Sequence, residues 1–228
     1  MPAAGRGERL GPGVPKALRL LGGVPMLVHA VRAMTQARLV DLVIVAAPPD
    51  DVTEVRELLD AHQVPKEVRV VSGGDSRQES VRRALETLPG DVAVVLVHDA
   101  ARPLTPSELA DDVAGAVLHG ARAVTPATAV ADTVKRIDET GRVVETLRRD
   151  DLVMVQTPQG FDRELLAKAH DAAVIDDYAG TDDASLVERV GASVVVVPGH
   201  DEAFKVTRPG DLVVAEAVLR RRLDHRGG

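Results

Sequence analysis

The 228-residue chain has no cysteine and no tryptophan, and it contains a single tyrosine and two phenylalanines. The absence of cysteine excludes disulfide bonds and thiolate metal sites, and it agrees with a reducing compartment. No apolar run reaches the roughly 18 residues that a membrane-spanning helix needs. The N-terminal region also lacks the basic-then-apolar order of a signal peptide. We therefore expect a cytoplasmic protein with no membrane partner.

Basic residues are also fewer than acidic ones, with 28 lysines and arginines against 35 aspartates and glutamates. The formal net charge is −7 at pH 7, so no global positive field would draw nucleic acid to the surface, and we expect no nucleic acid partner. Lysine is scarcer still, because arginine carries most of the positive charge. A lysine in a distinctive setting is therefore a candidate for function. The lysines are Lys16, Lys66, Lys135, Lys168 and Lys205.

Apolar, β-branched runs alternate with amphipathic segments along the chain. The runs predict strands at 42–47, 68–71, 92–97 and 194–197. Helices are predicted at 25–37, 50–61, 76–88, 106–119, 162–174, 182–190 and 208–224. Such alternation favours right-handed crossovers and a mainly parallel sheet with helices on both faces. We predict a single three-layer α/β domain that spans residues 1–228.

Residues 128–152 break this alternation. Two segments of alternating polarity, 132–137 and 143–147, flank the turn Asp138-Glu139-Thr140-Gly141. This pattern predicts an antiparallel hairpin. A hairpin outside the main sheet is either a neutral insertion or an arm that grips another subunit.

The beginning of the chain resembles the end of a strand. Pro2-Ala3-Ala4-Gly5 has the form of a strand end followed by a turn, and the body of that strand would lie before Met1. Without that body, we expect a weakened centre of the sheet and a looser loop after it.

The loop that follows is rich in glycine and extends to Lys16. Gly5 and Gly7 let backbone amides approach phosphate oxygens, and clustered amides form an anion-binding concavity to which Arg9 and Lys16 would add full charges. The loop is not a Walker A loop, and it is not a dinucleotide fingerprint, because Leu10 stands where the third glycine would be. A phosphate site and a plain turn are both compatible with these residues.

Asp99 follows directly on the most apolar of the predicted strands. Ligands bind at the carboxyl ends of the strands in open α/β sheets. A carboxylate there could hold Mg²⁺, which takes one or two protein carboxylates and completes its shell with phosphate oxygens and water. The alternative is that Asp99 caps a turn. We expect the neighbouring His98 to pack beneath the loop.

Three further segments lie at the starts of predicted helices. Gly73-Gly74-Asp75 precedes Ser76, which could be a simple N-cap with Glu79 completing a capping box, but the double glycine also suits a flat ligand such as a nucleobase. Lys205 stands between apolar neighbours, which favours an inward, anion-facing role. The acidic segment 181–185 is compatible with a helix cap and with a metal site.

Seven segments together resemble one enzyme family over nearly the whole chain. They are Pro2-Ala3-Ala4-Gly5-x-Gly7-x-Arg9, Pro15-Lys16, Gly73-Gly74-Asp75-x-Arg77-x-x-Ser80, His98-Asp99-Ala100-Ala101-Arg102-Pro103, Asp132-Thr133-Val134-Lys135, Thr157-Pro158-Gln159 and Phe204-Lys205-Val206-Thr207. The family resembled is that of the 2-C-methyl-D-erythritol 4-phosphate cytidylyltransferases. The resemblance implies a Rossmann-like nucleotidyltransferase fold, Mg²⁺ as cofactor and a homodimer. It also implies cytidylyl transfer from CTP to 2-C-methyl-D-erythritol 4-phosphate, giving 4-diphosphocytidyl-2-C-methyl-D-erythritol and pyrophosphate in the non-mevalonate isoprenoid pathway.

The resemblance also implies roles for single residues. The catalytic groups around the triphosphate are Arg9, Lys16 and Lys205, and the metal ligand is Asp99. The nucleotide contacts are Ala3, Ala4, Gly5, Gly7, Gly74, Asp75 and Ser80. The contacts to the acceptor are Arg102, Thr133, Arg149 and Thr181. Thr133 and Arg149 would reach the partner's site from the hairpin arm, with Arg149 preferred to Arg148 because of its spacing to Thr157-Pro158-Gln159.

Two other functions stay open at this point. A cytidylyltransferase of the same fold that acts on ribitol 5-phosphate would have the same CTP side. A nucleotide-binding subunit without catalysis is the second alternative, but such a subunit would not need to keep Lys16, Asp99 and Lys205 together.

Overall fold

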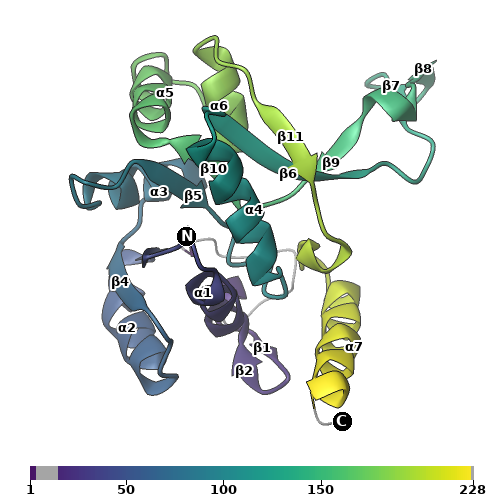
Figure 1. Cartoon of the computed structure of the whole chain (residues 1–228). Helices are drawn as coiled ribbons and strands as arrows, with labels where there is room; N and C mark the ends of the chain where they lie inside the picture. The colour runs from purple at the N-terminus through teal and green to yellow at the C-terminus, as the bar shows by residue number, and fades with distance from the viewer. Residues whose placement is uncertain (4–14, 227–228) are drawn as a thin grey trace.

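The computed structural model describes residues 1–3 and 15–226 (Figure 1). Seven α-helices alternate with short strands in the described part of the chain. The helices are α1 (Met26–Gln36), α2 (Val52–Ala61), α3 (Arg77–Glu86), α4 (Ser107–Leu118), α5 (Arg163–Ile175), α6 (Asp183–Arg189) and α7 (Pro209–Arg226). Short 3-10 turns are η2 (Lys16–Leu18), η3 (Pro49–Asp51), η4 (Arg149–Asp151) and η5 (Asp201–Ala203). Each helix predicted from the sequence is present within a few residues of its predicted ends.

The strands form two separate sheets in the body of the molecule and two small hairpins. β3 (Leu42–Ala47) and β4 (Glu67–Ser72) pair in parallel. The second sheet has the order β11-β6-β10-β5, and β9 also pairs with β6. Its strands are β5 (Val94–Val97), β6 (Ala123–Ala129), β9 (Val153–Val155), β10 (Gln159–Asp162) and β11 (Val195–Pro198). β1 (Leu20–Leu21) and β2 (Val24–Pro25) form a hairpin before α1.

The strand directions make the second sheet mixed. β11 runs parallel to β6, whereas β10 runs antiparallel to both β5 and β6. The α/β class is confirmed, but β10 interrupts the parallel arrangement that the sequence predicted. The interruption was not foreseeable from the pattern of β10, because Gly160 and the preceding Pro158 are typical of turns.

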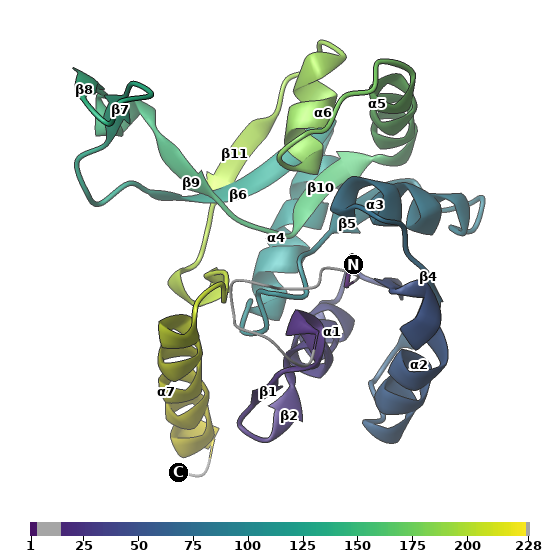
Figure 2. The same cartoon turned by 180° about the vertical axis from the view of Figure 1, so that it is seen from behind.

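Helices cover both faces of the second sheet, so the fold has three layers. Val113 and Val117 of α4 pack against Val124 on one face. Ala123 on β6 and Phe161 on β10 point to the other face of the sheet, where they pack against α3, α5 and α6. Since successive side chains of a strand point to opposite faces, this alternation fixes the two layers. Figures 1 and 2 show α4 on the side opposite to α5 and α6.

Gly160 allows α4 to approach β10 closely. A Cβ on this residue would lie 2.6 Å from Val113 Cγ1 and 3.1 Å from Val117 Cγ2. The helix could therefore not keep its position over any larger residue at this point of the strand.

The N-terminal residues form an isolated parallel bridge beside β3. Ala3 N donates to Ala46 O at 2.8 Å, and Ala46 N donates to Met1 O at 3.0 Å. Pro2 lies opposite Ala46 in a parallel bridge. The strand end predicted at residues 2–5 is thus observed where the structure describes it. It brings Ala3 to the carboxyl-end edge of β3, close to the turn that follows β5.

The predicted hairpin is present and stands away from the body of the molecule (Figure 2). β7 (Lys135–Ile137) pairs antiparallel with β8 (Val143–Thr146). The Asp138 side chain accepts hydrogen bonds from the Thr140 and Arg142 amides, and Gly141 takes a φ of +81°. At the base of the hairpin, β9 pairs with the second half of β6. Among the described residues, no helix is long and apolar enough to cross a membrane.

Candidate active site

A pocket of about 500 Å³ opens at the carboxyl ends of β3 and β5. Six segments that are distant in the sequence converge on it: residues 2–3, η2, the prolines that follow β3, the loop before α3 with its first turn, the turn after β5, and the segment before α7. The lining residues that were already candidates from the sequence are Ala3, Lys16, Gly74, Asp75, Ser80, Asp99 and Lys205. The structure therefore brings together, in one cavity, all the described nucleotide, metal and catalytic candidates.

Asp99 is the buried acid of this pocket. Lys205 Nζ donates to its Oδ2 at 2.7 Å, and Arg77 Nε donates to its Oδ1 at 3.1 Å. Burial opposes ionisation of the carboxyl, but the positive charges of Arg77 and Lys205 outweigh it and hold the pKa of Asp99 well below its ordinary value. Thr157 Oγ1 accepts a hydrogen bond from the Asp99 amide and so fixes the backbone of the turn. Asp99 is a carboxylate at neutral pH.

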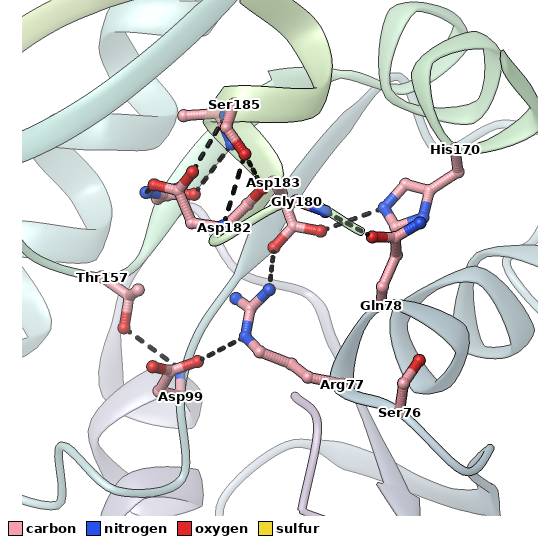
Figure 3. Close-up of polar contacts among 12 residues, drawn as sticks. Ser76, Arg77, Gln78, Asp99, Thr157, His170, Gly180, Asp182, Asp183 and Ser185 are labelled. Carbon is pink, nitrogen blue, oxygen red and sulfur yellow. Dashed lines mark hydrogen bonds and ion pairs between the residues drawn. The ribbon is translucent and has the colours of Figure 1, made fainter. Parts of the chain in front are cut away.

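Arg77 connects the pocket to a second buried acid (Figure 3). Its NH1 nitrogen lies 2.7 Å from Asp183 Oδ2, while its Nε nitrogen contacts Asp99. Asp183 is fully buried at the start of α6, and its other oxygen lies 3.0 Å from His170 Nε2 on α5. Burial opposes ionisation of Asp183, but the bond from His170 and the charge of Arg77 lower its pKa. One arginine therefore joins α3 to the turn after β5 and to α6.

The loop before α3 contains the N-cap that its sequence suggested, and it also lines the pocket. Ser76 caps α3 by accepting from the Glu79 amide at 3.0 Å, while Glu79 Oε2 accepts from the Asp75 amide instead of closing a capping box on Ser76. Ser80 is fully buried, and its hydroxyl accepts from the Gly74 amide at 3.0 Å. The same loop therefore caps α3 and forms part of the cavity wall. The hydrogen bonds with Ser80 and Glu79 hold Gly74 and Asp75 at the cavity.

The two candidate lysines face the pocket from opposite ends of the chain. Lys16 begins η2, and Lys205 lies between η5 and α7. Lys205 is partly exposed and lines the pocket, where its ammonium group contacts Asp99, and its predicted role toward an anionic ligand stays a prediction. Three cations, Lys16, Arg77 and Lys205, against the two carboxylates of Asp75 and Asp99 leave the pocket with a positive balance, which suits a polyanionic ligand.

His98 and Arg102 lie behind the pocket instead of lining it. His98 is buried as predicted, with Nδ1 3.1 Å from Thr157 Oγ1, and burial lowers its pKa to about 4. The Arg102 guanidinium donates to the carbonyl oxygens of Ala203 and Val155. Arg102 therefore ties the turn after β5 to η5 and β9, and its predicted contact with an acceptor stays a prediction.

The other predicted acceptor residues do not reach this pocket within one chain. Thr133 and Arg149 are exposed on the hairpin arm, where Arg149 donates to Ala131 O at 2.9 Å. Thr181 is exposed directly before the cap of α6. Four further candidates, Ala4, Gly5, Gly7 and Arg9, lie outside the described residues.

Three residues of the site gained their roles only from the folded structure. Arg77 appeared only as part of a motif, and its bridging of two acids depends on the folded arrangement. The sequence was compatible with Asp183 in a helix cap or in a metal site, but in the structure Asp183 is the buried ion-pair partner of Arg77. Gln159, at the start of β10, donates to Asp182 Oδ2 at 2.7 Å and accepts from the Ala184 amide, so it positions the start of α6.

The donor set fits a cation that brings most of its own ligands. No cluster of three or more acids or histidines occurs in the described part of the chain. Asp99 is the buried carboxylate in the pocket, and a carboxylate oxygen that accepts one hydrogen bond from a cationic side chain keeps a second lone pair. This suits Mg²⁺ bound by one carboxylate together with phosphate oxygens and water.

Comparison with known proteins gives one consistent result. The sequence model of the family described as 2-C-methyl-D-erythritol 4-phosphate cytidylyltransferase matches residues 1–221. A protein of that name from Streptomyces coelicolor is 60% identical over 97% of this chain and 84% of its own length.

Solved structures agree with the sequence comparison. The crystal structure of 4-diphosphocytidyl-2C-methyl-D-erythritol synthase from Anaerococcus prevotii has a TM-score of 0.84 and 29% identity, and the match covers 96% of this chain and 93% of that one. The crystal structure of 2-C-methyl-D-erythritol 4-phosphate cytidylyltransferase from Thermus thermophilus has a TM-score of 0.76 and 36% identity. That match covers 91% of this chain and 95% of the other.

Proposed function

The chain belongs to the 2-C-methyl-D-erythritol 4-phosphate cytidylyltransferase family, and we propose that the pocket of Lys16, Asp99 and Lys205 is where its reaction occurs. The enzyme transfers a cytidylyl group from CTP to 2-C-methyl-D-erythritol 4-phosphate and releases pyrophosphate. The observation that carries the proposal is the convergence of two lysines and one buried carboxylate on a cavity of about 500 Å³. Cavities of roughly 300 to 1,000 Å³ are typical of small-molecule sites.

The chemistry requires positive charge more than a base. A phosphate oxygen of the acceptor forms a bond to the α-phosphorus of CTP, and the bond from that phosphorus to the β-phosphate oxygen breaks. The nucleophile is already an anion, so no side chain has to remove a proton. The protein must instead hold two anions together and offset the charge of the transition state, which Lys16 and Lys205 do from two sides. Arg9, in the loop before Lys16, is proposed to contribute in the same way.

The nucleobase side is proposed to be the loop before α3. Ser80 and Glu79 hold the backbone of Gly74 and Asp75, so peptide groups face the cavity without a bulky side chain at Gly74. A rigid backbone edge can hydrogen-bond a pyrimidine with little loss of conformational entropy on binding. Further nucleotide contacts are proposed for Ala3 and for the loop residues Ala4, Gly5 and Gly7.

Mg²⁺ is the proposed cofactor, held by Asp99 with phosphate oxygens of the nucleotide. It would neutralise phosphate charge and orient the triphosphate when bound. Asp99 is ready for this role because its lowered pKa keeps it ionised. Lys205 and Arg77 hold the carboxylate in place from either side.

The hairpin arm is proposed to join two copies of the chain. Six apolar residues of the arm and its base are 41 to 59% exposed, which is unusual for an isolated chain. They are Ile137, Val143, Val144, Val153, Met154 and Val155. In the proposed homodimer, Thr133 and Arg149 complete the acceptor side of the partner's pocket together with its Arg102 and Thr181. The proposed location is the cytoplasm, which supplies CTP.

A mixing experiment tests the site and its sharing together. Arg149→Ala should raise the KM for the alcohol phosphate, and Lys16→Ala should abolish most turnover. Mixed after exchange of subunits, the two variants should recover part of the lost rate, because some pockets then combine an intact Lys16 with an intact partner arm. Pyrophosphate release is the assay, and each variant mixed with itself is the control. No recovery in a confirmed mixed dimer would contradict the shared site, and faster turnover with ribitol 5-phosphate would reassign the acceptor.

A further inference from the structure

The beginning of α3 connects two loops that come from distant parts of the chain. On one side, Ser80 and Glu79 hold the backbone of the loop before the helix, which is proposed to contact the nucleobase. On the other side, the first two residues of the helix contact the segment between α5 and the start of α6. This segment carries Thr181, a proposed contact to the acceptor. One helix end therefore contacts both the nucleotide side and the acceptor side of the proposed site.

Gln78 binds this segment with both ends of its side-chain amide. Its Oε1 atom accepts a hydrogen bond from the Gly180 amide at 3.0 Å, and its Nε2 atom donates to the Tyr178 carbonyl oxygen at 3.0 Å. The two backbone groups flank residue 179, so one side chain satisfies a backbone donor and a backbone acceptor together. Figure 3 shows the Gln78 side chain beside Gly180. The pair of bonds fixes the direction of this backbone as well as its distance from α3.

Thr181 lies between two residues whose backbone is held in place. Gly180 is bound by Gln78, and Asp182 is the N-cap of α6. Gly180 is also closely packed, because a Cβ on it would lie 2.6 Å from Leu186 Cδ2 and 3.1 Å from Asp182 O. Thr181 itself is exposed. Its neighbours are therefore fixed while the residue stays accessible to a ligand.

The same segment is linked to the proposed metal ligand. Arg77, next to Gln78, lies 2.7 Å from Asp183 Oδ2 through NH1 and 3.1 Å from Asp99 Oδ1 through Nε. Asp183 comes two residues after Thr181 in the sequence. The first two side chains of α3 therefore attach the segment on both sides of Thr181.

We propose that Gln78 is a positioning residue that keeps Thr181 in the conformation in which it contacts the acceptor. The inference rests on the proposed function, in which Thr181 binds the alcohol phosphate. Without the two Gln78 bonds the segment would gain conformational freedom, and the acceptor would have to order it on binding. CTP should bind as before, because the bonds that Ser80 and Glu79 make to the nucleobase loop do not involve Gln78.

Two substitutions in the full chain test this inference. Gln78→Met removes both hydrogen bonds with little change in volume, and Gly180→Ala displaces the same segment from the α6 side with Gln78 intact. Each should raise the KM for 2-C-methyl-D-erythritol 4-phosphate by about three- to tenfold, the effect of losing one or two hydrogen bonds. The dissociation constant of CTP and kcat at saturating acceptor should each stay within about twofold of the parent. Hydrogen exchange of the Gly180 amide should be at least about fivefold faster in Gln78→Met.

A control and a double variant separate positioning from a general effect on the fold. Arg82→Met is the matched control, because Arg82 lies on the same helix but pairs with Glu86. It should leave both substrate constants and the exchange of the Gly180 amide at the values of the parent. Thr181→Val should raise the acceptor KM by itself. Gln78→Met should then add little in the Thr181→Val background, because the contact that it prepares is already lost.

The outcomes that would overturn the inference differ from those that concern the proposed site. Unchanged exchange of the Gly180 amide in Gln78→Met would show that the contact does not hold the segment. Faster exchange with an unchanged acceptor KM would remove the positioning role, and so would equal losses in CTP and acceptor binding. Increases in KM that multiply in the double variant would show that Gln78 acts without Thr181. Each of these results leaves the site in place if Lys16→Ala is inactive, whereas an active Lys16→Ala variant contradicts the site itself.

Discussion

Lys205 Nζ and Asp99 Oδ2 lie 2.7 Å apart, which joins the segment before the last helix to the turn after β5. The contact places a cation beside the buried acid that is proposed to bind the metal. A phosphate group entering the pocket would meet both the lysine and the cation held by the acid. Lys205 orients Asp99, and in the proposed mechanism it would also act on the ligand.

Alanine at Lys16 or Lys205 should lower kcat far more than it raises the dissociation constant of CTP. Groups that act mainly on the transition state affect turnover more than ground-state binding, and we expect a loss of about 10²- to 10³-fold in kcat. Lys168→Ala, on the outer side of α5, is the matched control. Pyrophosphate release and equilibrium CTP binding measure the two quantities. Near-full turnover in both pocket variants would remove the proposed mechanism.

Arg77→Met should destabilise the fold through the acids that it leaves behind. Asp183 is fully buried, and loss of one partner of a buried ion pair costs about 3 to 5 kcal/mol. The double variant Arg77→Met with Asp183→Asn should recover part of this stability, because the isolated charge is gone. Urea unfolding of the single and double variants provides the test. Additive losses in the double variant would show that the two residues do not act as a pair.

With Asp99 as the proposed Mg²⁺ ligand, Asp99→Asn should shift the dependence of activity on Mg²⁺ to higher metal concentration. The amide is uncharged, so it binds the cation poorly and also leaves Lys205 and Arg77 without their shared anion. Turnover should fall by about 10²-fold or more. A magnesium titration of both proteins at fixed CTP measures the effect. An unchanged titration curve in the variant would place the metal on other groups.

The Met1 amino group should make stability depend on pH in a defined window. Its pKa is about 5 in the folded chain against 8.0 ordinarily, so between these values the unfolded chain binds the proton and the folded chain does not. Stability should therefore rise as the pH increases from about 5 to 8. Acetylation of Met1 should flatten this part of the profile. An identical slope in the acetylated and free proteins would show that the amine is not the source.

Val144→Asp on β8 should convert the proposed dimer into monomers. Val144 is 58% exposed on the hairpin arm, and a charge in a shared apolar surface would be desolvated without a partner. Val174→Asp is the control, since Val174 is similarly exposed on α5, away from the arm. Sedimentation equilibrium of the parent and both variants measures the change. A parent that is monomeric at working concentration would contradict the proposed arm contact.

The sequence predicted most of the secondary structure because its periodic segments are long. The strand at 42–47 and the seven helices were found from hydrophobic period and helix-start signals. β6 was missed because Pro126 interrupts it, and β10 was missed because it is short and contains Gly160. Both strands depend on pairing with distant partners, which local propensity does not record.

Site residues that belong to sequence motifs could be predicted. Roles that depend on the packing of distant elements could not. Lys16, Asp99 and Lys205 were identified, and the structure brings them together in one pocket. The bridging role of Arg77 depends on the meeting of α3, α6 and the β5 turn, which no spacing along the chain reveals. Arg102 shows the converse, because a residue in a recognisable motif donates to backbone carbonyls behind the pocket.

The order in which the pocket segments occur along the chain has a consequence for biosynthesis. The lining residues of the cavity range from Ala3 to Lys205 and beyond, so the cavity cannot be complete until these residues have left the ribosome. A nucleotide that binds there as proposed can therefore stabilise only a chain that has emerged beyond Lys205. Because its closing contacts join such remote residues, the catalytic centre should also be among the last regions to form during refolding.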